Sequence, residues 1–119
     1  LRSERLVWMG STTLLVWSLY ALETITALNG VAGLGLSWKA ALSVFALSSL
    51  GMLLPSSPGA IGVYEAIAVA ALRAHDVPHE QALAAALFAH MAQFIPVTLA
   101  GGLAMLAFPP EPKKEGAEG

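Results

Sequence analysis

The chain is 119 residues long; 56% of its residues are hydrophobic and only 12% are charged. That charged fraction is about half of what a soluble domain carries. A net charge of -2, without a cluster of basic residues, argues against nucleic acid as a partner. The sequence has no cysteine, which excludes disulfides, zinc–thiolate centres and thiol catalysis.

Charged residues are absent from three long stretches of the sequence, Leu6–Leu22, Ala40–Tyr64 and Gln81–Pro110. About 20 uncharged, mostly apolar residues are enough to cross a bilayer as a helix. A helix in the core of a soluble protein would show a polar face every three or four residues, and these stretches show none. The pattern predicts an all-α fold, a polytopic transmembrane helix bundle of a multi-pass protein in the cell (plasma) membrane.

Two helices are expected in the first half of the chain. The first covers about residues 6–28 and ends at the turn signal Asn29-Gly30. The second covers about residues 39–54, with Ser37 as its N-cap. It would be about 24 Å long at the helical rise, which is short for a bilayer core about 30 Å thick.

Two further helices and a tail are expected in the second half. A third, also short, covers about residues 58–74, with Ser57 as N-cap and Pro58 at its first position. The fourth covers about residues 78–108 and is long enough to span, with a kink expected at Pro96. Residues 1–108 thus form one transmembrane helical domain, and residues 109–119 a disordered polar tail.

The Pro/Gly interruption between the two short helices, Pro55–Gly59, has two interpretations. A broken helix at membrane depth is tolerated only inside protein or against a water-filled cavity, which predicts a re-entrant helix pair. The alternative is an ordinary loop at the water interface between two short crossings. The motif alone leaves both open.

The start of the third helix is the candidate lipid-binding site. Free N–H groups at a helix N-terminus suit an anion, and glycines allow close approach. Glu65 is an intramembrane carboxylate, a functional candidate by default, expected one to two turns deeper than the anion site; a residue near the interface or a protonated one is the alternative. The candidate residues are Ser57, Pro58, Gly59, Gly62 and Glu65.

Other polar residues in the apolar segments have plainer interpretations. His90 and Gln93 share a helix face and form a secondary polar site, or simply make interhelical hydrogen bonds. Glu23 is expected to reach the interface. Two sets of small residues are expected to pack against neighbouring helices. The set on the third helix, a seam with Glu65 beside it, is Gly62, Ala66, Ala70 and Ala74; the set on the fourth is Ala82, Ala85, Ala86, Ala89 and Ala92 with Gly101 and Gly102.

No nucleophile–base pair, metal-ligand spacing or phosphate-cradling loop occurs in the sequence. We therefore expect no catalytic residue, no metal and no cofactor.

The stretch Leu54–Glu65 resembles the signature of the lysylphosphatidylglycerol synthase transmembrane-region family. The residues that match are Pro55, Pro58, Gly59, Gly62 and Glu65, whereas Ala60 stands where the family pattern has a second glycine. The resemblance extends over about residues 37–108.

The resemblance implies a flippase-like membrane domain that translocates (aminoacyl-)phospholipid or a related lipid between leaflets. The aminoacyl-transferase domain of the resembled synthases is absent from this chain, so the chain is not expected to be an enzyme. The expected partners are membrane phospholipid and the remaining N-terminal transmembrane helices of a larger bundle, and self-association is left open. The alternatives are a structural or anchoring module without transport activity and, less favoured, a membrane-embedded transferase.

The placement of basic residues predicts that both ends of the chain face the cytoplasm. Arg2 and Arg5 precede the first span and the pair Lys113-Lys114 follows the last, whereas only Lys39 and Arg73 mark the other side. Basic residues favour the cytoplasmic side.

Overall fold

The computed structural model describes residues 2–111, in which all regular secondary structure is helical. The elements are α1 (Arg2–Ile25), the π-helical η1 (Thr26–Val31), α2 (Trp38–Gly51), the 3-10 turn η2 (Pro58–Ala60), α3 (Val63–Arg73) and α4 (His79–Ala107). The predicted all-α class is confirmed for this range. The disordered tail predicted at 109–119 lies, from residue 112, outside the described residues.

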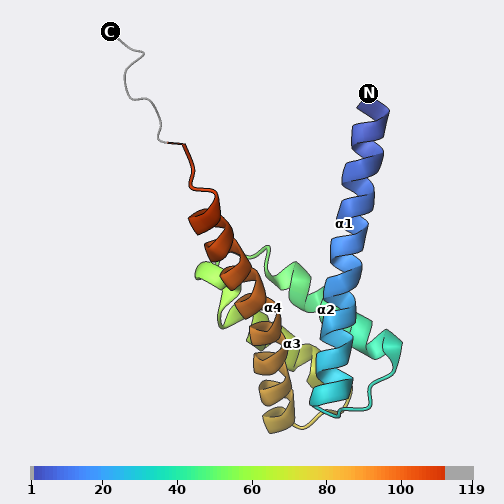
Figure 1. Ribbon diagram of the computed structural model, residues 1–119. Helices are drawn as coiled ribbons and strands as arrows, with labels where there is room; N and C mark the ends of the chain where they lie inside the picture. The colour runs from blue at the N-terminus through green and yellow to red at the C-terminus, as the bar shows by residue number, and fades with distance from the viewer. Residues whose placement is uncertain (1, 112–119) are drawn as a thin grey trace.

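Two helices are long and apolar enough to cross a membrane, α1 together with η1 over Arg2–Val31, and α4. They lie against each other near one end and diverge toward the other, where α1 begins and α4 ends (Figure 1). Their large apolar side chains face outward: Leu14 is 71% exposed and Leu106 is 82% exposed. A core helix of a soluble protein would bury such residues, so these surfaces are suited to lipid or to further helices.

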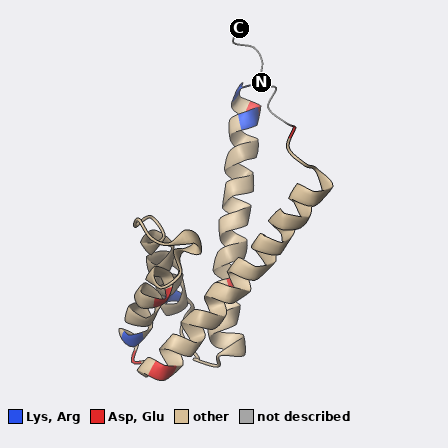
Figure 2. Ribbon diagram, turned by 90° about the vertical axis from the view of Figure 1, so that its left-hand side faces the viewer, with Lys and Arg blue, Asp and Glu red and all other residues tan. Residues whose placement is uncertain are grey.

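Charged residues lie mostly near the ends of the long helices, and the lengths between them are nearly free of charge (Figure 2). This distribution is typical of membrane-spanning helices, because a charge in the hydrocarbon core is costly. Two charged residues are exceptions. Glu23 in α1 is partly buried, and Glu65 in α3 is buried.

Helices α2 and α3 form a short hairpin beside the long pair. With 14 and 11 residues they extend about 21 and 16 Å at the helical rise, less than a bilayer core. Ser37 caps α2 as predicted, its hydroxyl accepting from the Ala40 N–H at 3.2 Å. Helix α2 ends at Gly51, three residues before the expected end.

Helix α3 begins at Val63, five residues after the start predicted at Pro58. The backbone explains the difference, because Gly59 and Gly62 have φ values of 73° and 90°, which no right-handed helix contains. Ser57 therefore does not cap α3; its hydroxyl donates to the Ile61 carbonyl at 2.9 Å. The predicted N-cap at Ser57 is wrong, and Pro58 begins only the three-residue turn η2.

The core lies where α3 packs between α2 and α4. Small side chains dominate it, which lets the helices approach closely. The predicted packing surface of α4 is confirmed for Ala82, Ala85, Ala86 and Ala89, all buried, whereas Ala92 is partly buried and the predicted Gly101 and Gly102 are exposed in this chain. The predicted seam on α3 is wrong within this chain: Gly62, Ala66, Ala70 and Ala74 are exposed, and the opposite face is buried.

Hydrogen bonds from side chains and from helix caps stabilise the connections between the helices. The first long helix does not end at Asn29-Gly30 but continues through Val31. Asn29 instead stabilises the following loop. Its side-chain amide donates to the Leu36 carbonyl and accepts from the Leu36 N–H, both at 2.8 Å. After α3, Asp76 takes a φ of 63° and the Val77 N–H donates to the Leu72 carbonyl, a Schellman-type end.

Candidate functional site

Glu65 lies in the first turn of α3. Its Oε2 accepts a hydrogen bond of 2.6 Å from the N–H of Gly62, the residue that caps the helix. The carboxylate thus occupies the N-terminus that the sequence suggested was free for an anion. It does not lie one to two turns deeper than the start of α3, because that helix begins later than predicted.

Glu65 is paired with His90 of α4. Nδ1 of His90 lies 2.5 Å from Oε1 of Glu65, and the two residues are 1% and 7% exposed. The sequence placed His90 with Gln93 in a separate, secondary site; the structure instead joins His90 to Glu65. One signal in the sequence could have suggested the pair, because an ionisable residue in an uncharged helix needs a polar partner.

Aromatic rings hold the imidazole of His90 in place. Tyr64 stacks on it with centroids 4.4 Å apart and planes inclined by 26°, and Phe94 meets it edge-on at 6.1 Å. Nε2, the other ring nitrogen, is buried and has no hydrogen-bond partner within residues 2–111. The ring is therefore oriented at one nitrogen and open to a partner at the other.

The break between α2 and α3 reaches α4 at one contact, between Gly59 and Phe94. A Cβ added to Gly59 would stand 2.7 Å from Cε2 of Phe94, too close for any other residue without a shift. Phe94 lies about 22 Å along α4 from its start, at the helical rise. The break thus reaches about half the length of the long helix.

An open cavity of about 400 Å³ lies beside His90, between α1, the break and α4. It is lined by Trp17, Tyr20, Met52, Gly59, Ala60, His90, Gln93, Phe94, Val97 and Thr98. Of the predicted site residues, Gly59, His90 and Gln93 line it, and Glu65 lies behind His90. The other three, Ser57, Pro58 and Gly62, are exposed and are not part of its lining.

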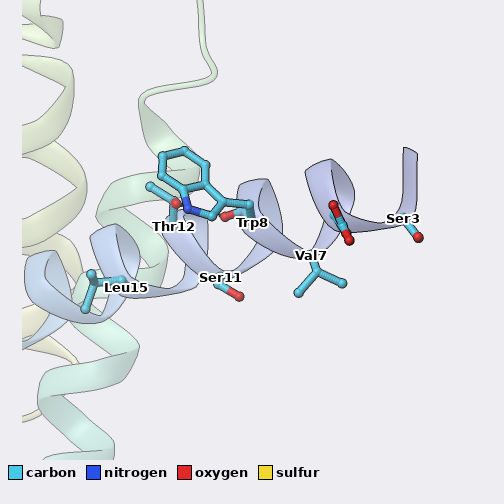
Figure 3. Close-up of a pocket in the computed structure, with 7 residues that line it drawn as sticks. Ser3, Val7, Trp8, Ser11, Thr12 and Leu15 are labelled. Carbon is cyan, nitrogen blue, oxygen red and sulfur yellow. Dashed lines mark hydrogen bonds between the residues drawn. The ribbon is translucent and has the colours of Figure 1, made fainter. Parts of the chain in front are cut away.

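Another hollow, of about 510 Å³, is more polar and lies at the loops that flank α2 and α3, with Ser37, His75 and Asp76 in its lining. A depression along the outer half of α1 is lined by residues of that helix alone, among them Val7, Trp8 and Ser11, all exposed (Figure 3). Glu23 is half-buried and its Oε1 has no partner in the described part of the chain, so the expectation that it reaches the interface is not met. Within residues 2–111, no group of three or more acidic or histidine residues could hold a metal ion.

Comparison with curated proteins and with solved structures found no match. One family model does match, described as the lysylphosphatidylglycerol synthase TM region, over residues 1–101. The match covers most of the chain, including the break, Glu65 and His90. This chain therefore belongs to the lysylphosphatidylglycerol synthase transmembrane-region family, a family of lipid-related membrane proteins.

Proposed function

We propose that this chain is part of a flippase-like membrane domain that translocates phospholipid, aminoacylated or not, between leaflets. The observation that carries the proposal is the Glu65–His90 pair, buried beside a break in the helices at half the length of a membrane-spanning helix. Family membership supports the lipid-related part of the proposal.

The hairpin of α2 and α3 is proposed to be re-entrant. Each helix is too short to cross, and Gly59 at its tip packs on Phe94 in the middle of α4. Both loops that flank the hairpin, residues 32–37 and 74–78, lie toward the end of the molecule where α4 begins (Figure 1). Residues 52–59, 61 and 62 of the break are exposed in this chain, so in this arrangement the other helices of the larger bundle would shield their backbone.

A polar pair at this depth suits the passage of a lipid headgroup. A headgroup that crosses hydrocarbon loses its hydration, and an unpaired charge away from water is costly. Glu65 and His90 offer a negative and a hydrogen-bonding group beside an open cavity with Gln93 in its lining. Through His90, which lines the cavity, the pair would replace part of the lost hydration and so lower the barrier to translocation.

A structural or anchoring module is the second candidate, and one observation favours it. Both carboxylate oxygens of Glu65 already have partners within the chain, the Gly62 N–H and His90 Nδ1. On this account the pair only stabilises the packing of α3 on α4. In either account we propose a multi-pass location in the cell membrane with cytoplasmic ends, and no aminoacyl transfer by this chain.

A leaflet-resolved assay separates the two candidates. The full chain is reconstituted in liposomes with fluorescent phosphatidylglycerol, and a membrane-impermeant quencher reports the lipid in the outer leaflet over time. We expect faster exchange than in protein-free liposomes. Exchange no faster than in those liposomes would support the anchoring module instead.

The role of the carboxylate is tested by Glu65→Gln in the same assay. The amide keeps the shape and can keep both hydrogen bonds, so we expect unchanged protein abundance but about tenfold slower translocation, through loss of the charge. Glu80→Gln is the matched control, because Glu80 is exposed in the first turn of α4. If the Glu65→Gln chain translocates lipid at the unmodified rate, the Glu65–His90 pair only joins α3 to α4 and has no role in transport.

A further inference from the structure

We propose that the cavity beside His90 is a binding site for a single phospholipid, whose phosphate accepts a hydrogen bond from Nε2–H of His90. Glu65 is then a positioning residue that acts through the imidazole rather than a group that touches the lipid. The inference rests on the proposed function for the choice of a lipid, but it concerns binding and not transport.

The two nitrogens of His90 have different surroundings. Nδ1 faces Oε1 of Glu65, whereas Nε2 is buried without a partner within residues 2–111, in a residue that is 1% exposed and lines the cavity. A buried polar atom without a partner is costly and is rare in native structures. A ligand in the cavity would supply the missing partner.

The hydrogen-bonding roles of the pair indicate which kind of ligand fits. Oε2 of Glu65 accepts from the Gly62 N–H and Oε1 faces Nδ1 of His90, so both oxygens can act as acceptors, as those of a carboxylate do. A buried carboxylate needs a partner, and Nδ1–H of His90 would supply it at 2.5 Å. An anionic phosphate oxygen at Nε2 would favour the imidazolium form, in which both ring nitrogens donate, and would accept a charge-assisted bond there.

The walls of the cavity suit the rest of a phospholipid. Trp17, Phe94 and Val97 offer apolar surface to the glycerol and the first part of an acyl chain, and Gln93 and Thr98 add polar atoms. A volume of about 400 Å³ holds a headgroup with its glycerol but not two whole acyl chains. Trp17 and Val97 are each about half exposed, so the chains can leave the cavity between α1 and α4, where the helices diverge (Figure 1).

The three histidines of the chain allow a direct test by NMR. The full chain, labelled with 15N-histidine in detergent micelles, is titrated with short-chain phosphatidylglycerol, with short-chain diacylglycerol, which lacks the phosphate, and with inorganic phosphate. We expect the Nε2 signal of His90 to shift saturably with phosphatidylglycerol alone. His75, which bonds to Ser43, and the exposed His79 should stay unchanged as internal controls.

Each other outcome of the titration overturns part or all of the site. An equal response to diacylglycerol would show that the phosphate is not recognised. An equal response to inorganic phosphate would show an anion site without lipid selection. No response of His90 to any probe, or an equal response of all three histidines, would remove the site.

Variants test the two residues separately. His90→Phe keeps a ring between Tyr64 and Phe94 but removes both nitrogens, so binding of phosphatidylglycerol should weaken at least tenfold, with His79→Phe as the matched control. Binding is followed by the fluorescence of Trp17 in a chain with Trp8→Phe and Trp38→Phe. In Glu65→Gln, which removes the carboxylate beside Nδ1, the saturable shift of the Nε2 signal of His90 with phosphatidylglycerol should be lost, which a merely structural role would not require.

The binding and transport results can fail independently. A chain that binds phosphatidylglycerol at His90 but does not speed translocation keeps the site and loses the proposed function. A chain that translocates lipid while His90 responds to none of the probes keeps the function and loses the site. If His90→Phe does not fold, the titration of the unmodified chain still decides.

Discussion

Nδ1 of His90 and Oε1 of Glu65 lie 2.5 Å apart, although 25 residues separate them in the chain. The pair joins the first turn of α3 to the middle of α4, directly behind the break that precedes α3. The same contact joins the residues just after the break to α4, and it leaves the other nitrogen of His90, a residue that lines the cavity, without a partner within residues 2–111.

Two substitutions of Glu65 separate the contribution of its charge to stability from the contribution of its hydrogen bonds. Glu65→Ala leaves the Gly62 N–H and Nδ1 of His90 without partners, so we expect a loss of about 2–4 kcal/mol in the free energy of unfolding. Glu65→Gln can keep both bonds and should lose less than about 1 kcal/mol. Thermal unfolding in detergent micelles measures both, with exposed Glu80→Ala as control; equal losses for Ala and Gln would contradict the pairing.

Gly59 and Gly33 form a matched pair for testing the contact of the break with α4. Both have positive φ values, 73° and 65°, but only a Cβ at Gly59 meets Phe94; at Gly33 it meets nothing within 4 Å. Gly59→Ala and Gly33→Ala share the backbone strain of about 1–2 kcal/mol. We expect Gly59→Ala to cost about 1–3 kcal/mol more, from overpacking. Equal midpoints of thermal unfolding for Gly59→Ala and Gly33→Ala would show that the break does not pack closely on Phe94 of α4.

The prediction of helices from the sequence succeeded where local signals decide. Ser37 begins α2 as predicted, because its hydroxyl can cap the helix without help from the rest of the chain. The start of α3 was placed five residues early, because Pro58 has a φ that suits a helix while Gly59 and Gly62 were treated only as small residues. Local signals do not show that Gly59 lies against Phe94 of α4, where an added Cβ would be too close.

The candidate site was predicted only in part for a similar reason. Glu65, Gly59, His90 and Gln93 were all identified from the sequence, but as two sites. The pairing of Glu65 with His90 depends on how α3 and α4 cross, and helix periodicity says nothing about that register. The buried face of α3 was also misjudged, since the small-residue seam through Ala66 and Ala70 faces outward in this chain.

Ala60 offers a test of the one departure from the family signature. It has a φ of 53°, in the left-handed region, where a side chain costs about 1–2 kcal/mol. Ala60→Gly removes that strain, and the greater freedom of glycine in the unfolded chain offsets about 0.4–1 kcal/mol of the gain. We expect a net stabilisation below about 1.5 kcal/mol, seen as a higher midpoint of thermal unfolding. A lower midpoint would show that the turn is unstrained.

Both ends of the chain are predicted to face the cytoplasm. The start of α1 and the end of α4 lie at one end of the molecule, and four of the six basic residues flank them in the sequence (Figure 1). Reporter fusions active only in the cytoplasm should be active at either end, and a reporter inserted at Asp76 should not. Activity of the inserted reporter, or inactivity of either terminal one, would contradict this orientation.

The central claim is that the break between α2 and α3 lies within the membrane rather than at its surface. The chain has no cysteine, so Ser57→Cys, Ser3→Cys and Asp76→Cys each give a single reactive thiol. Labelling with a membrane-impermeant maleimide is followed in right-side-out and inverted vesicles. We predict rapid labelling at residue 3 from the cytoplasmic side, rapid labelling at residue 76 from the opposite side, and slow labelling at residue 57 from both. Labelling at residue 57 from the cytoplasmic side, as fast as at residue 3, would contradict the account and make the break an ordinary surface loop.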